Sequence, residues 1–364
     1  MKIFKIMLPV IALLAVGTGC ANKHDANVAE QNKNSLLELS KEDEMFMDTC
    51  IKNFNAEKCN DLGVSFERGD GVKQSNKRAI DCYELACDKN YALACRNAGI
   101  LYIRRHNHEI FGIDLGDPEE LFQKSCNLND AEGCNDLGAV YQFGLELKGL
   151  APNFKKANAY YDKACNMGSG QACSNLGISY YNGHGVKKDY SKAKFYYEKA
   201  CNMNNGKGCY SLGVVYDEGA GVKKNFSKAN IYYEKACNLN YGGGCYNLGV
   251  SFQKGEGVKK NYGLANTYYE KACDLGYGLG CSNLGVLYEN GLGLRQNISM
   301  AVSYYEKSCK LKSSIGCTNL GGLYEYGIGV KLNRTAAKEY YGKGCDLGEQ
   351  KGCDAYRKLN EQGY

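Results

Sequence analysis

Several residue types that build common functional sites are scarce in this sequence of 364 residues. It has no tryptophan, three prolines and four histidines, and its formal net charge is only +5. This charge is small and evenly spread, which argues against a nucleic-acid-binding protein. Four histidines are too few for the clustered ligands of a hydrolytic zinc site. We therefore predict no cofactor, no metal ion and no nucleic-acid partner.

The chain begins with a charged segment and an apolar run that is too short to cross a membrane. Lys2 and Lys5 precede an apolar run of 11 residues from Ile6 to Val16, whereas a transmembrane helix needs about 20. Residues 1–20 are therefore predicted to be a signal peptide.

Two kinds of processing fit the end of this segment, "GTGC". It resembles a lipoprotein cleavage site that would leave a lipid on Cys20, and the alternative is ordinary signal-peptide cleavage near Ala21. Either one predicts a protein that is secreted, periplasmic or held at the cell envelope, with membrane contact only through a lipid anchor. The polar residues 21–40 are predicted to form a flexible tether.

Cysteine, by contrast, is abundant, with 20 residues. Eighteen of the nineteen after Cys20 form nine pairs, the first with a separation of nine residues and the others with eight. The pairs are Cys50 with Cys59, Cys87 with Cys95, Cys126 with Cys134, Cys165 with Cys173, Cys201 with Cys209, Cys237 with Cys245, Cys273 with Cys281, Cys309 with Cys317 and Cys345 with Cys353. Cys82 is left over. We interpret it as a small buried apolar residue, and the alternative is a reactive or intermolecular thiol.

The separation of eight residues decides the backbone around each pair. In one continuous helix eight residues rise about 12 Å, but a disulfide needs Cα atoms about 4.4–6.8 Å apart. The chain must therefore reverse between the cysteines, and "NMNNGKG" between Cys201 and Cys209 suits a reversal. Each pair is predicted to connect the end of one helix to the start of the next, antiparallel helix. Zinc is disfavoured because its cysteine ligands are normally about two to four residues apart and because an exported chain meets oxidising conditions.

The first cysteines recur every 36 residues from Cys165 to Cys345. A Leu-Gly step, a tyrosine pair and a GxGV turn follow the same period, which indicates a solenoid of helix pairs. Cys245, Leu248 and Gly249 lie on one face of a helix, and we predict that a neighbouring helix passes too close at the glycine for a side chain.

The remaining periodic features predict how each helix pair is connected and packed. The GxG turn reverses the chain, and the tyrosine pair and the Ala-Cys step form the buried face of the second helix. A serine near the start of that helix is predicted to be its N-cap. These serines are Ser191, Ser227 and Ser299.

The stretch "LGVVYDEGAGVKKNFSKANIYYEKA" resembles the Sel1-like repeat, a relative of the tetratricopeptide repeat. In this chain cysteine replaces alanine at two positions of the repeat. This replacement resembles the Helicobacter cysteine-rich protein family. The resemblance covers about residues 43–361 and implies an all-α, right-handed α-α superhelical solenoid with disulfide-stapled helix pairs. We assign residues 41–364 to this solenoid, as about eight repeats with flanking helices. The second repeat has a longer linker, in which Asp117-Pro118 predicts a late helix start with proline at its first position.

The resemblance also implies β-lactamase activity, because that cysteine-rich family is commonly labelled β-lactamase. It implies hydrolysis of a β-lactam amide and a β-lactam or peptidoglycan-like ligand. Serine β-lactamases need a Ser-x-x-Lys motif and a Lys-Thr-Gly-like strand. Ser-x-x-Lys occurs at Ser191/Lys194 and Ser251/Lys254, but both fall within the repeat pattern, and neither Lys-Thr-Gly nor Lys-Ser-Gly is present. The residues therefore identify no catalytic group, and whether the protein is an enzyme is left open.

A binding surface is the function that the residues favour. An asparagine recurs within two residues of the second cysteine, on the helix that lines the concave groove in tetratricopeptide-like solenoids. An amide both donates and accepts hydrogen bonds, which suits an extended peptide; the alternative is that each asparagine satisfies backbone groups between repeats. The candidates are Asn97, Asn135, Asn175, Asn247, Asn283 and Asn319. We predict a protein or peptide partner from the cell envelope or a host.

Lysine pairs also recur along one edge of the predicted solenoid, at 187–188, 223–224 and 259–260. We interpret them as solvated turn residues. The alternative is a basic stripe that binds an anionic wall polymer or a membrane surface.

Overall fold

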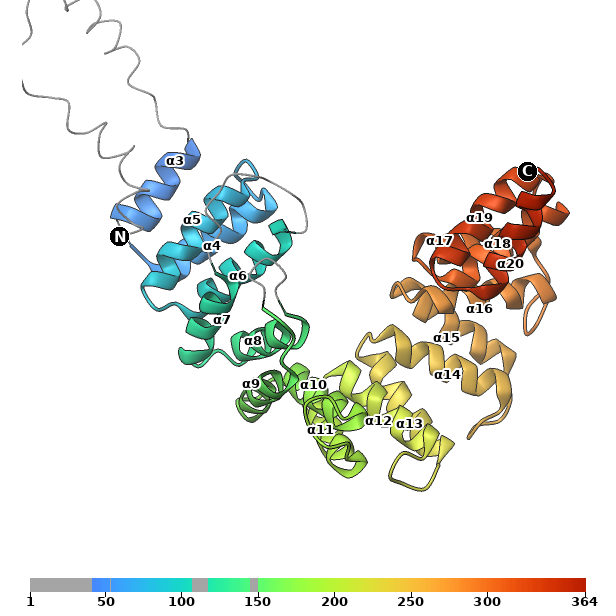
Figure 1. Cartoon of the computed structure of the whole chain (residues 1–364), viewed down its shortest axis with the longest axis horizontal. Coiled ribbons are helices and arrows are strands. Elements are labelled where there is room, and N and C mark those ends of the chain that lie inside the picture. Colours follow the sequence, from blue (N-terminus) through green and yellow to red (C-terminus); the bar gives the residue numbers. More distant parts are fainter. Residues whose placement is uncertain (1–40, 53, 107–116, 145–149) are drawn as a thin grey trace, which may run out of the picture. The chain divides into compact units, whose positions relative to one another are not determined.

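The computed structural model describes residues 41–52, 54–106, 117–144 and 150–364. The predicted signal peptide, the lipidation site Cys20 and the predicted tether lie outside the described residues. Every regular element in the described ranges is a helix, and the helices follow one another in chain order as packed pairs (Figure 1). The predicted all-α solenoid of disulfide-stapled helix pairs is confirmed.

Two kinds of helix alternate, and we name them by the cysteine that they carry. Helix A carries the second cysteine of a pair, and helix B carries the first. The A helices are α4 (Ala56–Arg68), α6 (Ala92–His106), α8 (Ala131–Phe143), α10 (Gly170–Asn182), α12 (Gly206–Glu218), α14 (Gly242–Lys254), α16 (Gly278–Asn290), α18 (Ser314–Tyr326) and α20 (Gln350–Glu361). The B helices are α5 (Asn76–Asp88), α7 (Pro118–Asn127), α9 (Phe154–Asn166), α11 (Tyr190–Asn202), α13 (Phe226–Asn238), α15 (Tyr262–Asp274), α17 (Ile298–Lys310) and α19 (Arg334–Asp346). Before them come α3 (Lys41–Phe46) and the π-helix η1 (Met47–Lys52), which carries Cys50.

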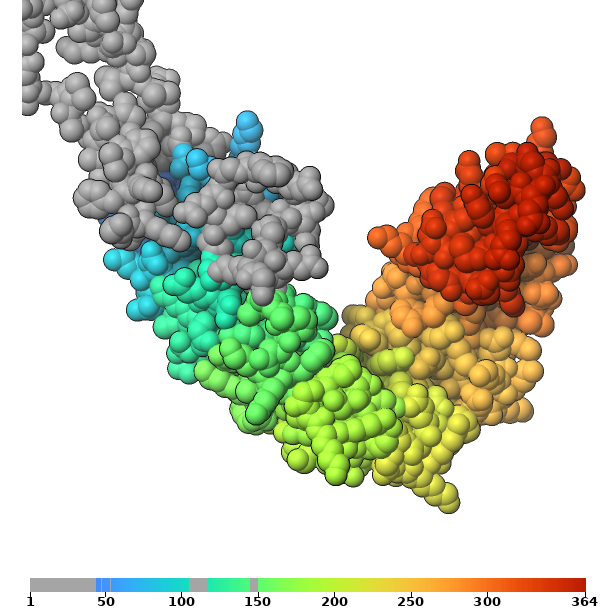
Figure 2. Space-filling model, in the orientation of Figure 1, coloured from blue at the N-terminus to red at the C-terminus, as the bar shows by residue number. Residues whose placement is uncertain are grey.

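The chain divides into two compact units, one ending at Ala86 and one beginning at Cys87. In the second unit each A helix from α8 to α18 packs against the B helices before and after it. Each A helix of this unit also contacts the A helix of the next repeat. Neighbouring repeats of this unit lie in contact in chain order in the space-filling view (Figure 2). The A helices therefore form a continuous row.

Nine disulfides connect the cysteine pairs that the spacing predicts, and each one joins the end of a B helix or of η1 to the start of the next A helix. The Cα atoms of the pairs are 4.4 to 5.1 Å apart, so the chain does reverse within each pair. The predicted pairing is therefore confirmed at every position. The bonded pairs are Cys50 with Cys59, Cys87 with Cys95, Cys126 with Cys134, Cys165 with Cys173, Cys201 with Cys209, Cys237 with Cys245, Cys273 with Cys281, Cys309 with Cys317 and Cys345 with Cys353.

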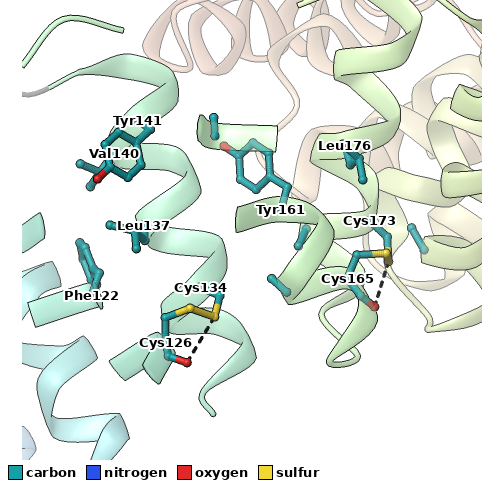
Figure 3. Close-up of a cluster of buried hydrophobic side chains, with 14 residues drawn as sticks. Phe122, Cys126, Cys134, Leu137, Val140, Tyr141, Tyr161, Cys165, Cys173 and Leu176 are labelled. Carbon is teal, nitrogen blue, oxygen red and sulfur yellow. Dashed lines mark hydrogen bonds between the residues drawn. A yellow bond between two sulfur atoms is a disulfide. The ribbon is translucent and has the colours of Figure 1, made fainter. Parts of the chain in front are cut away.

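The disulfides lie within the apolar core. Two of them, Cys126–Cys134 and Cys165–Cys173, border the cluster of buried side chains around α7 to α10 (Figure 3). The sulfurs thus belong to the core and also close its hairpins.

The glycine of each Leu-Gly step faces a tyrosine ring of the following B helix. A Cβ atom on Gly249 would lie 2.7 Å from Cδ1 of Tyr269, closer than side chains approach in folded proteins. This confirms the predicted close approach and identifies the second tyrosine of the pair as its cause. The same contact recurs at Gly138/Tyr161, Gly177/Tyr197, Gly213/Tyr233, Gly285/Tyr305 and Gly321/Tyr341.

The two tyrosines of a pair differ in burial, although the sequence predicts one buried face for both. The second tyrosine is buried, as at Tyr233 with 1% exposure. The first is half-buried and stacks on an aromatic ring of the A helix before it, as Tyr232 does on Tyr216 with 5.6 Å between ring centroids. Further stacks of this kind are Tyr141/Tyr160, Tyr180/Tyr196, Phe252/Tyr268, Tyr288/Tyr304 and Tyr324/Tyr340.

The prediction that serines cap the B helices is wrong. Each of these helices begins earlier, so Ser191 lies in the first turn of α11, and Asp189 is the N-cap, with its carboxylate accepting from the N–H of Lys192. Asparagine holds the cap position in five other B helices, whereas before α5 Ser75 Oγ accepts from the N–H of Arg78 at 3.3 Å. The asparagines are Asn153, Asn225, Asn261, Asn297 and Asn333. Ser227 and Ser299 likewise lie inside their helices. The late start of α7 at Pro118 with Asp117 as N-cap is confirmed.

The GxG turns end the A helices as predicted. Gly255 and Gly257 have φ angles of 82° and 70°, in the left-handed region that glycine adopts without strain. The N–H of Gly255 donates to the carbonyl of Ser251 and completes the last turn of α14. The chain then leaves the helix and enters the next B helix.

Candidate functional site

The candidate site is the row of A helices in the second unit. Asn97, Asn175, Asn247, Asn283 and Asn319 each follow a second cysteine by two residues, and all five are half-buried in this row. Asn135 instead follows Cys134 directly and is only 6% exposed. Asp136 takes the equivalent half-buried position in α8, where it accepts from Arg96 Nε at 2.7 Å. The six asparagines therefore occupy two positions that differ in accessibility.

Several of these asparagines connect neighbouring repeats. Asn175 Nδ2 donates to Asn135 Oδ1 at 3.1 Å, from α10 to α8. Asn247 on α14 lies close enough to the hydroxyls of Tyr210 on α12 and Tyr233 on α13 to oppose the rise that burial causes in their pKa. The amides thus meet polar groups of the chain itself, as the alternative interpretation expected, although here the partners are side chains.

The next two repeats continue this arrangement. Asn283 on α16 has the same effect on the pKa of Tyr246 and Tyr269. Asn319 on α18 has it on the pKa of Tyr305. Each amide therefore lies near a tyrosine hydroxyl of its own or the preceding repeat.

Tyrosine hydroxyls near these helices are neutral hydrogen-bond donors. Burial, and then the nearby Asp162 carboxylate, raises the pKa of Tyr196 to about 12. The hydroxyl of Tyr305 donates to Glu289 at 2.6 Å, and burial together with that carboxylate raises its pKa further. These two phenols therefore keep their protons at neutral pH.

Half of the lysines in the predicted basic stripe make cation–π contacts with aromatic rings. The Nζ atoms of Lys188, Lys224 and Lys260 lie 4.7, 4.4 and 4.8 Å from the ring centroids of Tyr190, Phe226 and Tyr262. The second lysine of each pair is thus held over the first residue of the next B helix by a cation–π contact. This local packing explains why lysine recurs at that position.

Neither Ser-x-x-Lys motif forms a nucleophile beside a neutral lysine. Lys194 Nζ lies 3.0 Å from Glu198 Oε1, and this hydrogen bond raises the pKa of Lys194, which keeps it protonated. Ser191 is exposed in the first turn of α11. Ser251 is buried at 6% exposure, while the ammonium of Lys254 is turned toward Glu256 at 3.9 Å. A lysine general base has to be deprotonated, so these pairs are better explained as parts of the repeat.

The unpaired cysteine lies beside the first disulfide, a contact that sequence reasoning missed. Cys82 is buried, and its Sγ atom is 3.9 Å from that of Cys50, which is bonded to Cys59. The three sulfurs form the one grouping with metal-ligand geometry in the described ranges. Burial, followed by the nearby Asp81 carboxylate, raises the pKa of Cys82 to about 12. A protonated thiol next to a formed disulfide offers no set of thiolate ligands.

A cleft of about 400 Å³ lies between α6, α7 and α8. Its lining is mainly apolar and includes Ile100, Phe122, Val140 and the largely exposed Phe143. The one carboxylate among the lining residues, Asp136, is paired with an arginine from α6. The cleft therefore presents apolar surface and no available acid or base.

Two further observations concern the cellular environment. Nine disulfides in one chain are typical of a protein that folds in an oxidising, extracytoplasmic compartment. Within the part of the chain that the structure describes, none of the helices has both the length and the apolar character needed to cross a membrane. Of the few histidines, His108 lies outside the described residues, and His184 is exposed in a turn.

Comparison with known proteins identifies the repeat. A model of the Sel1 repeat matches seven segments that together make up more than half of the chain. They are residues 59–91, 131–169, 170–205, 206–241, 243–277, 278–313 and 314–349. No curated protein matches the sequence.

Solved structures share this architecture. A protective antigen of uropathogenic Escherichia coli strains that displays an SLR fold is 23% identical, with a TM-score of 0.58, over 86% of this chain and 70% of that chain. A Sel1 repeat protein from Oxalobacter formigenes is 25% identical, with a TM-score of 0.57, over 62% of this chain and 94% of its own. Cysteine-rich protein B of Helicobacter pylori is 38% identical over 37% of this chain and 98% of its own, with a TM-score of 0.31.

Proposed function

Because the chain belongs to the Sel1 repeat family, we propose that it is an exported scaffold whose A-helix row binds a protein or peptide partner at the cell envelope or on a host. The half-buried amides along this row carry the proposal. Asn175, Asn247, Asn283 and Asn319 are held by neighbouring side chains yet are not fully buried. A pre-oriented amide binds a peptide backbone with little loss of side-chain entropy.

The disulfides support the same proposal. In the second unit each one ties the end of a B helix to the start of an A helix of the row, which restricts the motion of the row before a partner arrives. A rigid surface loses less entropy on binding than a flexible one. Oxidising conditions, which the disulfides require, also support a partner outside the cytoplasm.

A capture experiment tests the proposal. Purified, oxidised wild-type protein is immobilised and exposed to cell-envelope extract and to host-cell lysate, and the bound proteins are quantified by mass spectrometry. Asn247→Ala and Asn283→Ala should reduce capture of the enriched partner on the order of tenfold, because they remove amides from the row. Phe195→Ser and Ile231→Ser are matched controls, since both side chains are exposed on B helices, at 58% and 63%, and they should leave capture unchanged.

Two results would contradict the proposal. In one, capture is lost in the B-helix variants and kept in the asparagine variants, which would move the binding surface to the other side of the helices. In the other, the wild-type protein hydrolyses the chromogenic β-lactam nitrocefin and Ser191→Ala or Ser251→Ala abolishes turnover, which would make the protein an enzyme.

A further inference from the structure

Four tyrosines from two neighbouring repeats meet on the A-helix row, and we call them the tyrosine cluster: Tyr210, Tyr241, Tyr246 and Tyr277. The ring centroids of Tyr210 and Tyr241 are 5.2 Å apart, and those of Tyr246 and Tyr277 are 5.3 Å apart. A Cβ atom on Gly242, the residue after Tyr241, would lie 2.9 Å from Cβ of Tyr277, so the two ring pairs are neighbours. All four rings are half-buried.

The fold does not require tyrosine at these positions. Tyr210 and Tyr246 follow the second cysteine of their pairs, where Ser174 and Ser282 fill the equivalent positions and are fully buried. A serine is therefore large enough to pack between neighbouring A helices, and the tyrosine ring extends beyond that space toward the surface of the row.

The other two tyrosines occupy N-cap positions of A helices. Tyr241 and Tyr277 are the N-cap residues of α14 and α16, and neither makes a side-chain cap. In the preceding A helix Asn205 holds this position and accepts from the N–H of Gly208 at 2.8 Å. Two helices thus lack a stabilising contact that their neighbour has, and a tyrosine ring stands in its place.

Among the described residues, a lysine on the same helix as Tyr210 has no carboxylate partner. Lys207 is one helical turn before Tyr210 on α12, so the two side chains share a helix face. Its Nζ atom donates to Asn175 Oδ1 at 3.2 Å, and among the residues that the structure describes no carboxylate lies within ion-pair distance of it. Burial lowers the pKa of Lys207, which shows that its ammonium group is partly desolvated and uncompensated.

Glycine shapes the space between the lysine and the tyrosines. Gly243 in α14 occupies the position equivalent to Lys207. A Cβ atom on Gly243 would lie 3.0 Å from the Tyr241 ring and 3.3 Å from the Tyr210 ring. The missing side chain therefore lets both rings lie over the backbone of α14, where they form an aromatic surface.

We propose that the tyrosine cluster and Lys207 bind an extended peptide segment of a protein partner, in which an acidic residue stands beside an aromatic or proline side chain. The carboxylate would pair with the ammonium group of Lys207, and the apolar side chain would pack on the tyrosine rings. Asn247 and Asn283, which lie near the hydroxyls of Tyr210 and Tyr246, would support the rings. This inference rests on the proposed function and names the chemistry of its partner.

The probe is a display library of random short peptides, selected on immobilised, oxidised wild-type protein. We expect the selected peptides to be enriched in Asp or Glu next to Phe, Tyr, Trp or Pro. Lys207→Gln should weaken binding of these peptides on the order of tenfold and remove its dependence on salt concentration. Lys351→Gln is the matched control, because Lys351 holds the equivalent position in α20 and is exposed; it should leave binding unchanged.

Tyr241→Asn separates binding from folding. Asparagine at this position should cap α14 as Asn205 caps α12, so the melting temperature should stay the same or rise. Peptide binding should nevertheless fall on the order of tenfold, because a ring of the cluster is lost. A loss of binding together with increased stability cannot come from unfolding.

The outcomes distinguish this inference from the proposed function. Selection of peptides without acidic residues, or peptides that bind Lys207→Gln and Tyr241→Asn as tightly as wild type, would overturn the inference. If those peptides still depended on Asn283→Ala, the A-helix row would remain the binding surface. Absence of any selected peptide and of any captured protein would overturn both.

Discussion

The space between the A and B helices differs from the A-helix row in how strictly it repeats. Gly213/Tyr233, Gly249/Tyr269 and Gly285/Tyr305 place a ring within 2.6 to 2.7 Å of a missing Cβ atom in every case. On the row, the residue after the second cysteine is tyrosine in the first two of these repeats and serine in the third. Positions that every repeat needs for packing stay constant, whereas positions on the row, which we propose as the binding surface, differ between repeats.

This comparison predicts where substitutions will be costly. Changes between the helices should reduce stability and alter the row only indirectly. Changes on the row should alter binding with little effect on stability. Four experiments test the stability of the packed interior and are given from the largest expected effect to the smallest.

Removing one disulfide should reduce the free energy of unfolding more than any of the other changes. Cys237→Ala combined with Cys245→Ala keeps a small residue at both buried positions, so the main loss is the closed loop of the reversal. The chain-entropy model gives a loss of about 2.5 kcal/mol for such a loop. Denaturant unfolding of the oxidised protein measures the loss, and hydrogen exchange should place it in α13 and α14. A loss below about 0.5 kcal/mol would mean that packing alone holds the hairpin.

Two adjacent glycines in α18 should respond in opposite directions. A Cβ atom on Gly321 would lie 2.7 Å from the Tyr341 ring, whereas on Gly322 it would lie 3.6 Å from the Tyr341 hydroxyl, which is ordinary contact. Gly321→Ala should therefore cost about 2 kcal/mol through overpacking. Gly322→Ala should stabilise by up to about 1 kcal/mol, because alanine favours the helix. Thermal unfolding of the two variants compares them, and equal effects would show that the ring moves aside freely.

Much of this interior follows from the sequence. A separation of eight residues between bonded cysteines forces a reversal, and a glycine that recurs in a helix indicates a close neighbour. The identity of that neighbour does not follow, because both tyrosines of a pair are compatible with a buried face. Only the packing of α14 against α15 shows that Tyr269 covers Gly249 while Tyr268 stacks on Phe252.

The row was harder to predict. The contacts of Asn247 join three helices, and the isolation of Lys207 depends on the absence of a nearby carboxylate, which no local pattern encodes. The helix caps could have been predicted, because Asn225 and its equivalents recur with the same period as the cysteines. Serine is also a common N-cap residue, and the prediction therefore chose Ser227. The proximity of Cys82 to Cys50, 32 residues apart, is likewise a tertiary contact.

The cap assignment predicts a smaller difference within one helix. Asp189 accepts from the N–H of Lys192 at 2.9 Å, so Asp189→Ala should cost about 1 kcal/mol. Ser191→Ala changes an exposed residue of the first turn and should stay within about 0.5 kcal/mol. Denaturant unfolding of both variants measures the difference. A larger cost at Ser191 would restore serine as the cap.

The smallest effect on stability should come from ionisation of Cys82. In the first unit this residue holds the position of the first tyrosine of the pair. The pKa of this thiol is raised to about 12, as is that of the equivalent Tyr196 hydroxyl in the second unit. In the unfolded chain the thiol loses its proton above its ordinary pKa of 9.0, so its contribution to stability is full below that pH and declines as the pH rises to about 12. Near pH 8 the folded protein should resist iodoacetamide, because the thiolate fraction is on the order of one in ten thousand. The denatured, unreduced protein should take up the label at this cysteine. Rapid labelling of the folded protein would instead show that the thiol beside the Cys50–Cys59 disulfide is accessible and ionised, and that this region lacks the closed packing of the regular repeats.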